Sequence, residues 1–232
     1  MTNFLQDLGI GTTNDGHLSK GGELILQCIP NSPSSIKELD YDYAANDRVS
    51  KFVSSVWKNV ELRKSSGGVG NSVLGSAFEC LLALVLCIED IGPFFMQAEL
   101  TFVPNAKFDI LMYDESGWPI SLSIKTSLRE RYKQADLEAM ALKQVHRNSE
   151  SYLITLNESE AAAQAKKIEK RELVALDKII LATAKEFDEL ILDIKGRKLV
   201  DPDQVPVIRY RESEVNTKSA IERQISERQA NH

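Results

Sequence analysis

Two residues in the middle of the chain have the types and spacing that metal-assisted water chemistry requires. Asp109 opens an otherwise apolar segment of strand character, and Lys125 follows sixteen residues later at the end of the segment SLSIK. If the two segments pair as a hairpin, the carboxylate and the ammonium come within reach of each other. Such a pair can hold a divalent cation and orient a water molecule, but Asp–Lys pairs are also common surface salt bridges.

Two glutamates offer further carboxylates for the same chemistry. Glu138 follows Arg131 and Gln134 at steps of three and four, so these residues share a face of the helix that leaves the SLSIK strand. Glu79 is the lone carboxylate inside an expected apolar helix. Such a carboxylate must pair with another group or take up a proton. A core Arg or Lys, or backbone N–H groups, could equally be the partner of Glu79.

Charge is distributed unevenly along the chain. The net charge of -6 gives no global reason to expect a nucleic-acid partner. The nine residues from 125 to 133 nevertheless carry +3, because four cations oppose the single anion Glu130. A charge run of this kind is more often a solvated face than a phosphate-binding site, and both interpretations stay open.

The segments that must position these residues alternate between helix and strand signals. Hydrophobic spacing predicts helices over 47–62, 75–90, 130–147, 159–172 and 187–194. Strands are expected over 95–103, 108–113, 120–125, 151–156 and 176–183, with a turn at 104–106 and an edge strand at 205–210. This order predicts an α/β (α+β) fold with a central mixed β-sheet flanked by helices.

Composition divides the chain into three expected parts. Residues 1–72 form an N-terminal loop and helical segment, whose first 45 residues are rich in Gly, Ser, Asn and Pro and predict little regular structure. The run SSGGVGNS within it lacks the Gly-Lys-Ser/Thr ending of a phosphate-binding loop, so it is a hinge or a DNA-facing loop. Residues 73–211 are the expected core, and residues 212–232 a charged C-terminal tail.

Several protein classes are disfavoured by composition. With 43% hydrophobic and 27% charged residues, the chain has the composition of a soluble globular protein. Its most apolar stretch is too short and too interrupted for a membrane span, and the N-terminus lacks a signal-peptide pattern. The cysteines Cys28, Cys80 and Cys87 have no metal-binding spacing and are odd in number, which favours a reducing cytoplasm. Cys80 and Cys87 lie seven residues apart in the apolar stretch and are expected to be buried small hydrophobes.

Four spaced features together resemble type II restriction endonucleases of the PD-(D/E)XK superfamily, specifically the EcoRII/PspGI-like branch that reads CC/GG cores. In that branch a serine replaces the acid of the D/E-x-K element, as Ser123 does two residues before Lys125. A glutamate thirteen residues after the lysine supplies the lost carboxylate and corresponds to Glu138. A glutamate on the preceding core helix corresponds to Glu79. An Arg-Glu-Arg element four residues after the lysine corresponds to residues 129–131.

The resemblance implies a restriction-endonuclease-like core and a magnesium-dependent, site-specific deoxyribonuclease. Asp109, Glu138 and Glu79 would bind Mg²⁺, Lys125 would position the attacking water, and Ser123 would add at most a hydrogen bond around them. The expected substrate is double-stranded DNA at a short palindrome such as CCGG, CCNGG or CCWGG. A cytoplasmic homodimer without membrane association is implied.

The expected reading of bases rests on Arg129, Glu130 and Arg131. Arginine can donate two hydrogen bonds to guanine, and glutamate can accept one from the cytosine amino group. Glu130 could instead only form salt bridges with its neighbours. Lys133 is a weaker candidate for a backbone contact, and Trp57 is a candidate for stacking on an extruded base, with ordinary core packing as its alternative.

Two other functions fit the same sequence. The first is a DNA-binding relative that does not cleave, against which the complete set of four catalytic candidates argues. The second is a repair or junction nuclease of the same fold that recognises DNA shape, against which the base-reading Arg-Glu-Arg element argues.

Overall fold

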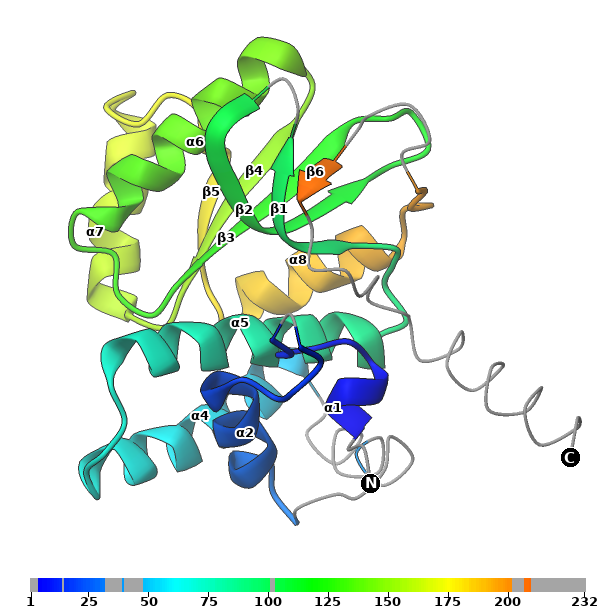
Figure 1. Ribbon diagram of the computed structural model, residues 1–232. Coiled ribbons are helices and arrows are strands. Elements are labelled where there is room, and N and C mark those ends of the chain that lie inside the picture. Colours follow the sequence, from blue (N-terminus) through cyan, green and yellow to red (C-terminus); the bar gives the residue numbers. More distant parts are fainter. Residues whose placement is uncertain are drawn as a thin grey trace, which may run out of the picture. The chain divides into compact units, whose positions relative to one another are not determined.

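The computed structural model describes residues 4–13, 15–31, 39, 48–100, 103–201 and 207–209. The described residues fall into two compact units, which are divided in the sequence between Pro93 and Phe94 (Figure 1).

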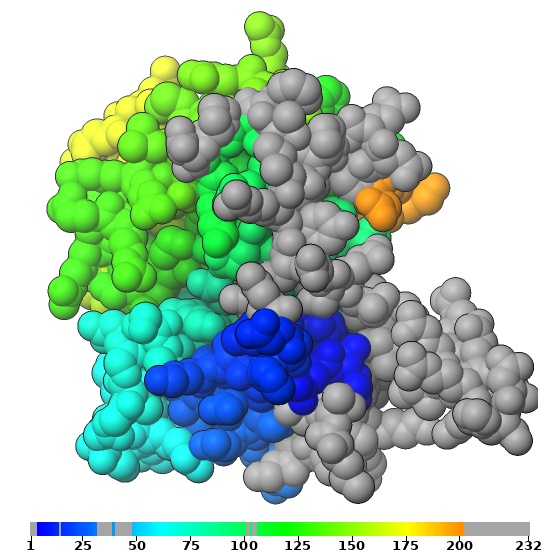
Figure 2. Space-filling model, in the orientation of Figure 1, coloured from blue at the N-terminus to red at the C-terminus, as the bar shows by residue number. Residues whose placement is uncertain are grey.

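The first unit is helical in its regular structure, with four described helices: α1 Phe4–Asp7, α2 Lys20–Cys28, α4 Val49–Ser65 and α5 Asn71–Ile88. Helix α2 starts where the Ser19 hydroxyl accepts a hydrogen bond from the Gly22 N–H at 3.2 Å. It packs closely on α5, because a Cβ added at Gly21 would lie 2.7 Å from the Ala77 backbone nitrogen. In the space-filling view, α2 and α4 form a continuous surface in blue and cyan (Figure 2).

The expectation of little regular structure in the first 45 residues is wrong for α1 and α2. The Gly21-Gly22 pair resembles a loop signal in the sequence. In the structure it lies inside α2, where the missing side chains permit the close approach of α5. A tertiary contact has therefore overridden the local propensity of glycine.

Helix α5 is the apolar helix that the sequence predicted. By length and composition alone it could cross a membrane, but 61% of it is buried within the protein, as in a core helix. The three cysteines are buried and form no disulfide, which confirms Cys80 and Cys87 as small core residues.

The second unit is built on a six-stranded mixed sheet with the order β5-β4-β3-β2-β1-β6. Its strands are β1 Phe95–Leu100, β2 Val103–Tyr113, β3 Pro119–Lys125, β4 Glu150–Thr155, β5 Lys178–Leu181 and β6 Val207–Arg209. Strands β6, β1, β2 and β3 pair antiparallel, whereas β3, β4 and β5 pair parallel. The predicted α/β fold with a central mixed sheet is confirmed, and β6 is the predicted edge strand.

Three described helices of this unit flank the sheet: α6 Arg131–Val145, α7 Glu158–Glu169 and α8 Lys185–Lys195. The crossovers β3-α6-β4 and β4-α7-β5 step across the sheet in the same direction. Because parallel crossovers are right-handed, this places α6 and α7 on one face and leaves the other to α8 (Figure 1). The side chains of β2 and β3 on the first face therefore point toward α6.

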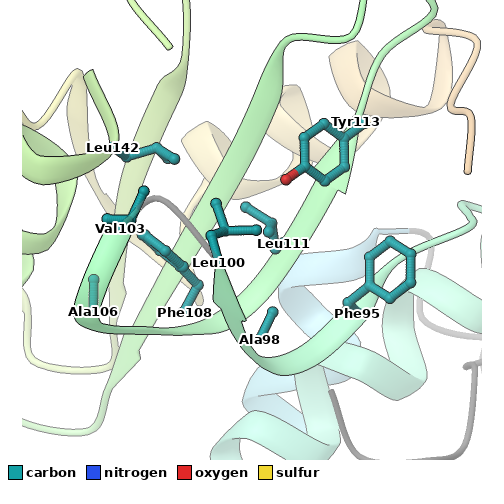
Figure 3. Close-up of a cluster of buried hydrophobic side chains, with 9 residues drawn as sticks. All are labelled: Phe95, Ala98, Leu100, Val103, Ala106, Phe108, Leu111, Tyr113 and Leu142. Atoms are coloured by element: carbon teal, nitrogen blue, oxygen red, sulfur yellow. The ribbon is translucent and has the colours of Figure 1, made fainter. Parts of the chain in front are cut away.

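A hydrophobic cluster on β1 and β2, with Leu142 from α6, fixes this arrangement (Figure 3). Leu100, Val103, Phe108 and Leu111 are each at most 3% exposed. The turn predicted at 104–106 is wrong, since β2 already begins at Val103, which pairs with Leu100. Residues 104–106 lie between the pairs Leu100–Val103 and Glu99–Lys107, where the register with β1 shifts, so an irregularity within β2 takes the place of the predicted turn.

The functional roles expected for the three parts of the sequence stay predictions. The structure groups α5 with the N-terminal helices, because α5 packs on α2, whereas the sequence assigned it to the core. The predicted C-terminal tail at 212–232 lies outside the described residues.

Candidate active site

Asp109 and Lys125 meet as predicted, through the pairing of β2 with β3. The two strands pair at Ile110 and Leu122, so one step further along them Asp109 and Ser123 follow on the same face. The Lys125 ammonium donates to Asp109 Oδ2 at 2.5 Å. Both side chains are nearly buried, at 12% and 9% exposure, which distinguishes this ion pair from an ordinary surface bridge.

The Asp109 carboxylate has two further hydrogen-bond donors. The Ile124 N–H donates to Oδ2 at 2.7 Å, and the Gln97 side-chain amide donates to Oδ1 at 3.3 Å. Gln97 lies on β1, so the strands on both sides of β2 donate to this one carboxylate. Gln97 was missed by the sequence analysis, because a glutamine in an alternating strand has no signal that separates it from a solvent-facing residue.

Glu138 projects from α6 toward the same face of the sheet. Its side chain is only 8% exposed and accepts a hydrogen bond from Gln134 at 2.8 Å, as expected for residues on one helix face. Burial raises the pKa of Glu138; the Lys125 ammonium lowers it and the Asp109 carboxylate raises it. These opposing influences show that Glu138 lies within electrostatic range of the Asp109–Lys125 pair.

Ser123 lies between the two charged strand positions and is buried at 6% exposure. It is opposite Leu153 of β4, on the face that α6 covers. The structure therefore places a small hydroxyl, and no carboxylate, at this position of β3.

The segment 126–130 connects β3 to α6 and carries the first two residues of the Arg-Glu-Arg run, whose last residue, Arg131, begins α6. Arg129, Glu130 and Arg131 are all exposed, and Arg129 has a positive φ of 30°. Lys133 Nζ donates to the Glu130 carboxylate at 2.5 Å, an exposed contact that lowers the pKa of Glu130. Glu130 thus has the neighbour pairing that the sequence allowed as an alternative, and the two arginines face solvent beside it.

The connection is anchored from α7 by a residue that sequence reasoning missed. Glu160 accepts hydrogen bonds from the Leu128 N–H at 2.6 Å and from the Ser127 hydroxyl at 3.2 Å. The Leu128 side chain is fully buried, at 0% exposure. The Arg-Glu-Arg run therefore starts from a fixed point, although its own side chains are exposed.

Two predicted site residues belong to the first unit. Glu79 is partly buried on α5, and its role as a metal ligand stays a prediction. Trp57 is 8% exposed, donates to Glu61 at 3.2 Å, and contacts the Phe78 ring with centroids 5.4 Å apart. These contacts are those of a packed core tryptophan, so base stacking at Trp57 has no support in the structure.

The donor set suits a hard cation that keeps most of its own water. Among the described residues, no three His, Cys, Asp or Glu side chains gather closely enough to enclose a metal ion. Asp109 and Glu138 instead supply two carboxylates around one ammonium, which leaves a net charge of about -1 in a largely buried place. Magnesium binds in this way, through one or two carboxylates with water and substrate phosphates, so these residues fit it.

No protein-family model, curated protein or solved structure matches this chain. The functional interpretation therefore rests on the geometry of Asp109, Lys125 and Glu138 and on the resemblance of their spacing.

Proposed function

We propose that this chain is a magnesium-dependent, site-specific endonuclease of double-stranded DNA, of the PD-(D/E)XK type. The observation that carries the proposal is the largely buried Asp109–Lys125 ion pair with Glu138 in electrostatic range. An ion pair that served only stability would not need a second buried carboxylate beside it, because that carboxylate adds uncompensated negative charge.

Each residue has a defined task in this proposal. Asp109 and Glu138 would hold Mg²⁺, and the metal-binding role that the resemblance implies for Glu79 stays a prediction. When bound, Mg²⁺ would polarise the phosphate and lower the pKa of a water molecule bound to it. Lys125 orients the attacking water and stabilises the negative charge that develops on the phosphate. Ser123 places a small, uncharged hydroxyl group beside them.

The proposed target is a short palindrome with a CC/GG core. Arg129 and Arg131 are exposed directly after the strand that carries Lys125, so a bound duplex could meet both sets of residues. Arginine reads guanine with two parallel hydrogen bonds, and Glu130 can accept from cytosine once it leaves Lys133. A palindrome read by one kind of chain favours a two-fold homodimer. A cytoplasmic location, without membrane association, belongs to the same proposal.

The test is cleavage of plasmid DNA in the presence of Mg²⁺, followed by mapping of the cut ends. The expected result is a set of discrete fragments whose ends lie at CC/GG-containing sites, and no cutting when Mg²⁺ is chelated. An Asp109→Ala variant is expected to lose cutting and to keep DNA binding.

Other outcomes separate the alternative functions. Site-specific binding without cutting by the wild type would identify a non-cleaving DNA-binding protein. Cutting at junctions or without sequence preference would identify a nuclease that recognises DNA shape. Either outcome would refute the site-specific endonuclease.

A further inference from the structure

Strand β1 has a backbone irregularity at Gln97, in addition to the register shift between Glu99 and Leu100 near its end. The φ of Gln97 is 55°, in the left-handed region that side-chain-bearing residues seldom adopt. The neighbours on both sides keep the regular register with β2, Met96 opposite Ile110 and Ala98 opposite Phe108. The regular ladder is therefore interrupted at the one step that faces Asp109.

The side chain of Gln97 reaches Asp109, the residue that the register with β2 places opposite it. Residues opposite each other in neighbouring strands lie on the same face of the sheet. In the structure the Gln97 amide donates to Asp109 Oδ1, while Lys125 and the Ile124 N–H donate to Oδ2. The two oxygens of the carboxylate are thus held from opposite sides, and this fixes the rotation of the group.

A strained conformation persists only where the surroundings enforce it, and such positions concentrate at functional sites. Glycine or asparagine would adopt the same backbone with less strain. Glutamine supplies what glycine lacks, an amide that reaches the carboxylate.

We propose that Gln97 is a positioning residue that orients the Asp109 carboxylate for binding a divalent cation. The proposal rests on the proposed nuclease function and extends it by one residue on a third strand. Its chemistry is that of a hydrogen-bond donor to a metal-binding carboxylate, whose loss typically weakens metal affinity about 10- to 100-fold.

The experiment compares the wild type with Gln97→Gly and Gln97→Asn. Gly removes the amide and relieves the backbone, whereas Asn tolerates the backbone but is one methylene too short to reach. Arg171→Gly is the matched control, because Arg171 also has a positive φ, 59°, and is exposed. Two quantities are measured: the Mg²⁺ concentration for half-maximal cleavage, and the Mg²⁺-induced rise in Tm without DNA.

We expect both Gln97 variants to need about 10- to 100-fold more Mg²⁺ for cleavage and to show a smaller Mg²⁺-induced rise in Tm. The Tm of Gln97→Gly without Mg²⁺ should not fall, and Arg171→Gly should behave as the wild type in both measurements. If Gln97→Gly does not fold, Gln97→Asn provides the same comparison.

The outcomes separate this inference from the proposed function. A wild type that cuts DNA, with Gln97 variants of unchanged Mg²⁺ dependence, overturns the inference alone. A wild type that binds Mg²⁺ without cutting, with variants that bind it more weakly, overturns the nuclease and keeps the inference. A wild type that neither binds Mg²⁺ nor cuts DNA overturns both.

Discussion

At the scale of one residue, burial disfavours the charged form of Glu138, whereas the proposed function needs its carboxylate to bind a metal ion. Burial is the main cause of its raised pKa, so the folded protein retains a proton on Glu138 at pH values where the unfolded chain has released it. The folded state then binds more protons than the unfolded state above about pH 4.5, the ordinary value for this group. Stability attributable to Glu138 therefore falls as the pH rises through that range.

A Glu138→Gln variant is accordingly expected to have a higher Tm than the wild type at pH 8 and a similar Tm at pH 4. The same variant should lose Mg²⁺-dependent cleavage, because the amide is a poor ligand. Thermal unfolding across the pH range measures the first effect, with the exposed Glu189→Gln as control. A Tm difference that does not change with pH would contradict the assigned environment of Glu138.

Lys125 is the cation that offsets the negative charges of Asp109 and Glu138. Removing one partner of a largely buried ion pair typically costs about 3–5 kcal/mol, because the other charge stays buried. Lys125→Met should therefore lower the unfolding free energy by about 3 kcal/mol at pH 8. The loss should be smaller at pH 5, because Glu138, whose pKa is raised by burial, is more protonated there. Lys125→Met should also abolish cleavage while DNA binding persists.

Chemical denaturation at the two pH values tests the prediction for Lys125. Lys185→Met is the matched control, because Lys185 forms an exposed pair with Glu189 at 74% and 61% side-chain exposure. Exposed pairs contribute about 0.2–1 kcal/mol at most. Equal losses for the two variants would show that the Asp109–Lys125 pair behaves as a surface bridge.

At the scale of elements, Asp136 secures the segment between α7 and β5. Its buried carboxylate accepts backbone hydrogen bonds from Val174, Ala175 and Leu176, at 3.3, 2.9 and 3.0 Å. Asp136→Ala would leave these donors without their acceptor, at about 1–3 kcal/mol for each buried group. We expect a loss of about 3 kcal/mol in unfolding free energy, measured by denaturation.

The loss at Asp136 should exceed that of Glu189→Ala, which removes only an exposed helix pair, by at least about 2 kcal/mol. Cleavage per folded molecule should be retained, since Asp136 contacts this segment and not the Asp109–Lys125 pair. A fully stable Asp136→Ala variant would mean that other groups satisfy the three N–H donors.

Glu160 has the corresponding role for the connection that carries the Arg-Glu-Arg run. Because it holds the Leu128 N–H and the Ser127 hydroxyl, Glu160→Ala should free the start of this run. Hydrogen exchange at the Leu128 amide is expected to accelerate by about tenfold, the loss of roughly 1.4 kcal/mol of protection. Discrimination between a CC/GG site and its single-base variants should fall with it.

Glu158→Ala is the matched control for Glu160, because it lies in the same first turn of α7 and is exposed. Rapid exchange at Leu128 with unaltered discrimination between sites would separate anchoring of the segment from base recognition. That result would refute the proposed link between Glu160 and specificity.

The sequence predicted elements well where one signal dominates and poorly where distant contacts decide. Apolar periodicity placed α5 and the strands around Asp109 and Lys125, and strand pairing then followed from their order. Helix α2 was missed, because the advantage of Gly21 exists only against the surface of α5. Gln97 and Glu160 were missed because their partners lie 12 and more than 30 residues away.

At the scale of the whole molecule, the net charge of -6 disfavours non-specific binding to DNA, whose phosphates are also negative. An acidic protein gains little from long-range attraction to phosphates, so binding must depend on a local cationic segment. In the second unit, Arg129, Arg131 and Lys133 form such a segment at the start of α6 and are exposed. The affinity for DNA should consequently fall as the salt concentration rises. The slope of log K against log salt reports how many phosphates the segment neutralises.

This predicts different effects for two cations of the same segment. Lys133→Ala should weaken binding equally on all DNA sequences and reduce the slope of log K against log salt by about 0.9. Arg129→Ala should weaken binding by about 1–3 kcal/mol on CC/GG sites and much less on other DNA. Fluorescence anisotropy from 50 to 300 mM salt, with Ca²⁺ in place of Mg²⁺ to prevent cutting, measures both. Identical behaviour of the two variants would assign the whole segment to the DNA backbone and leave base recognition to other residues.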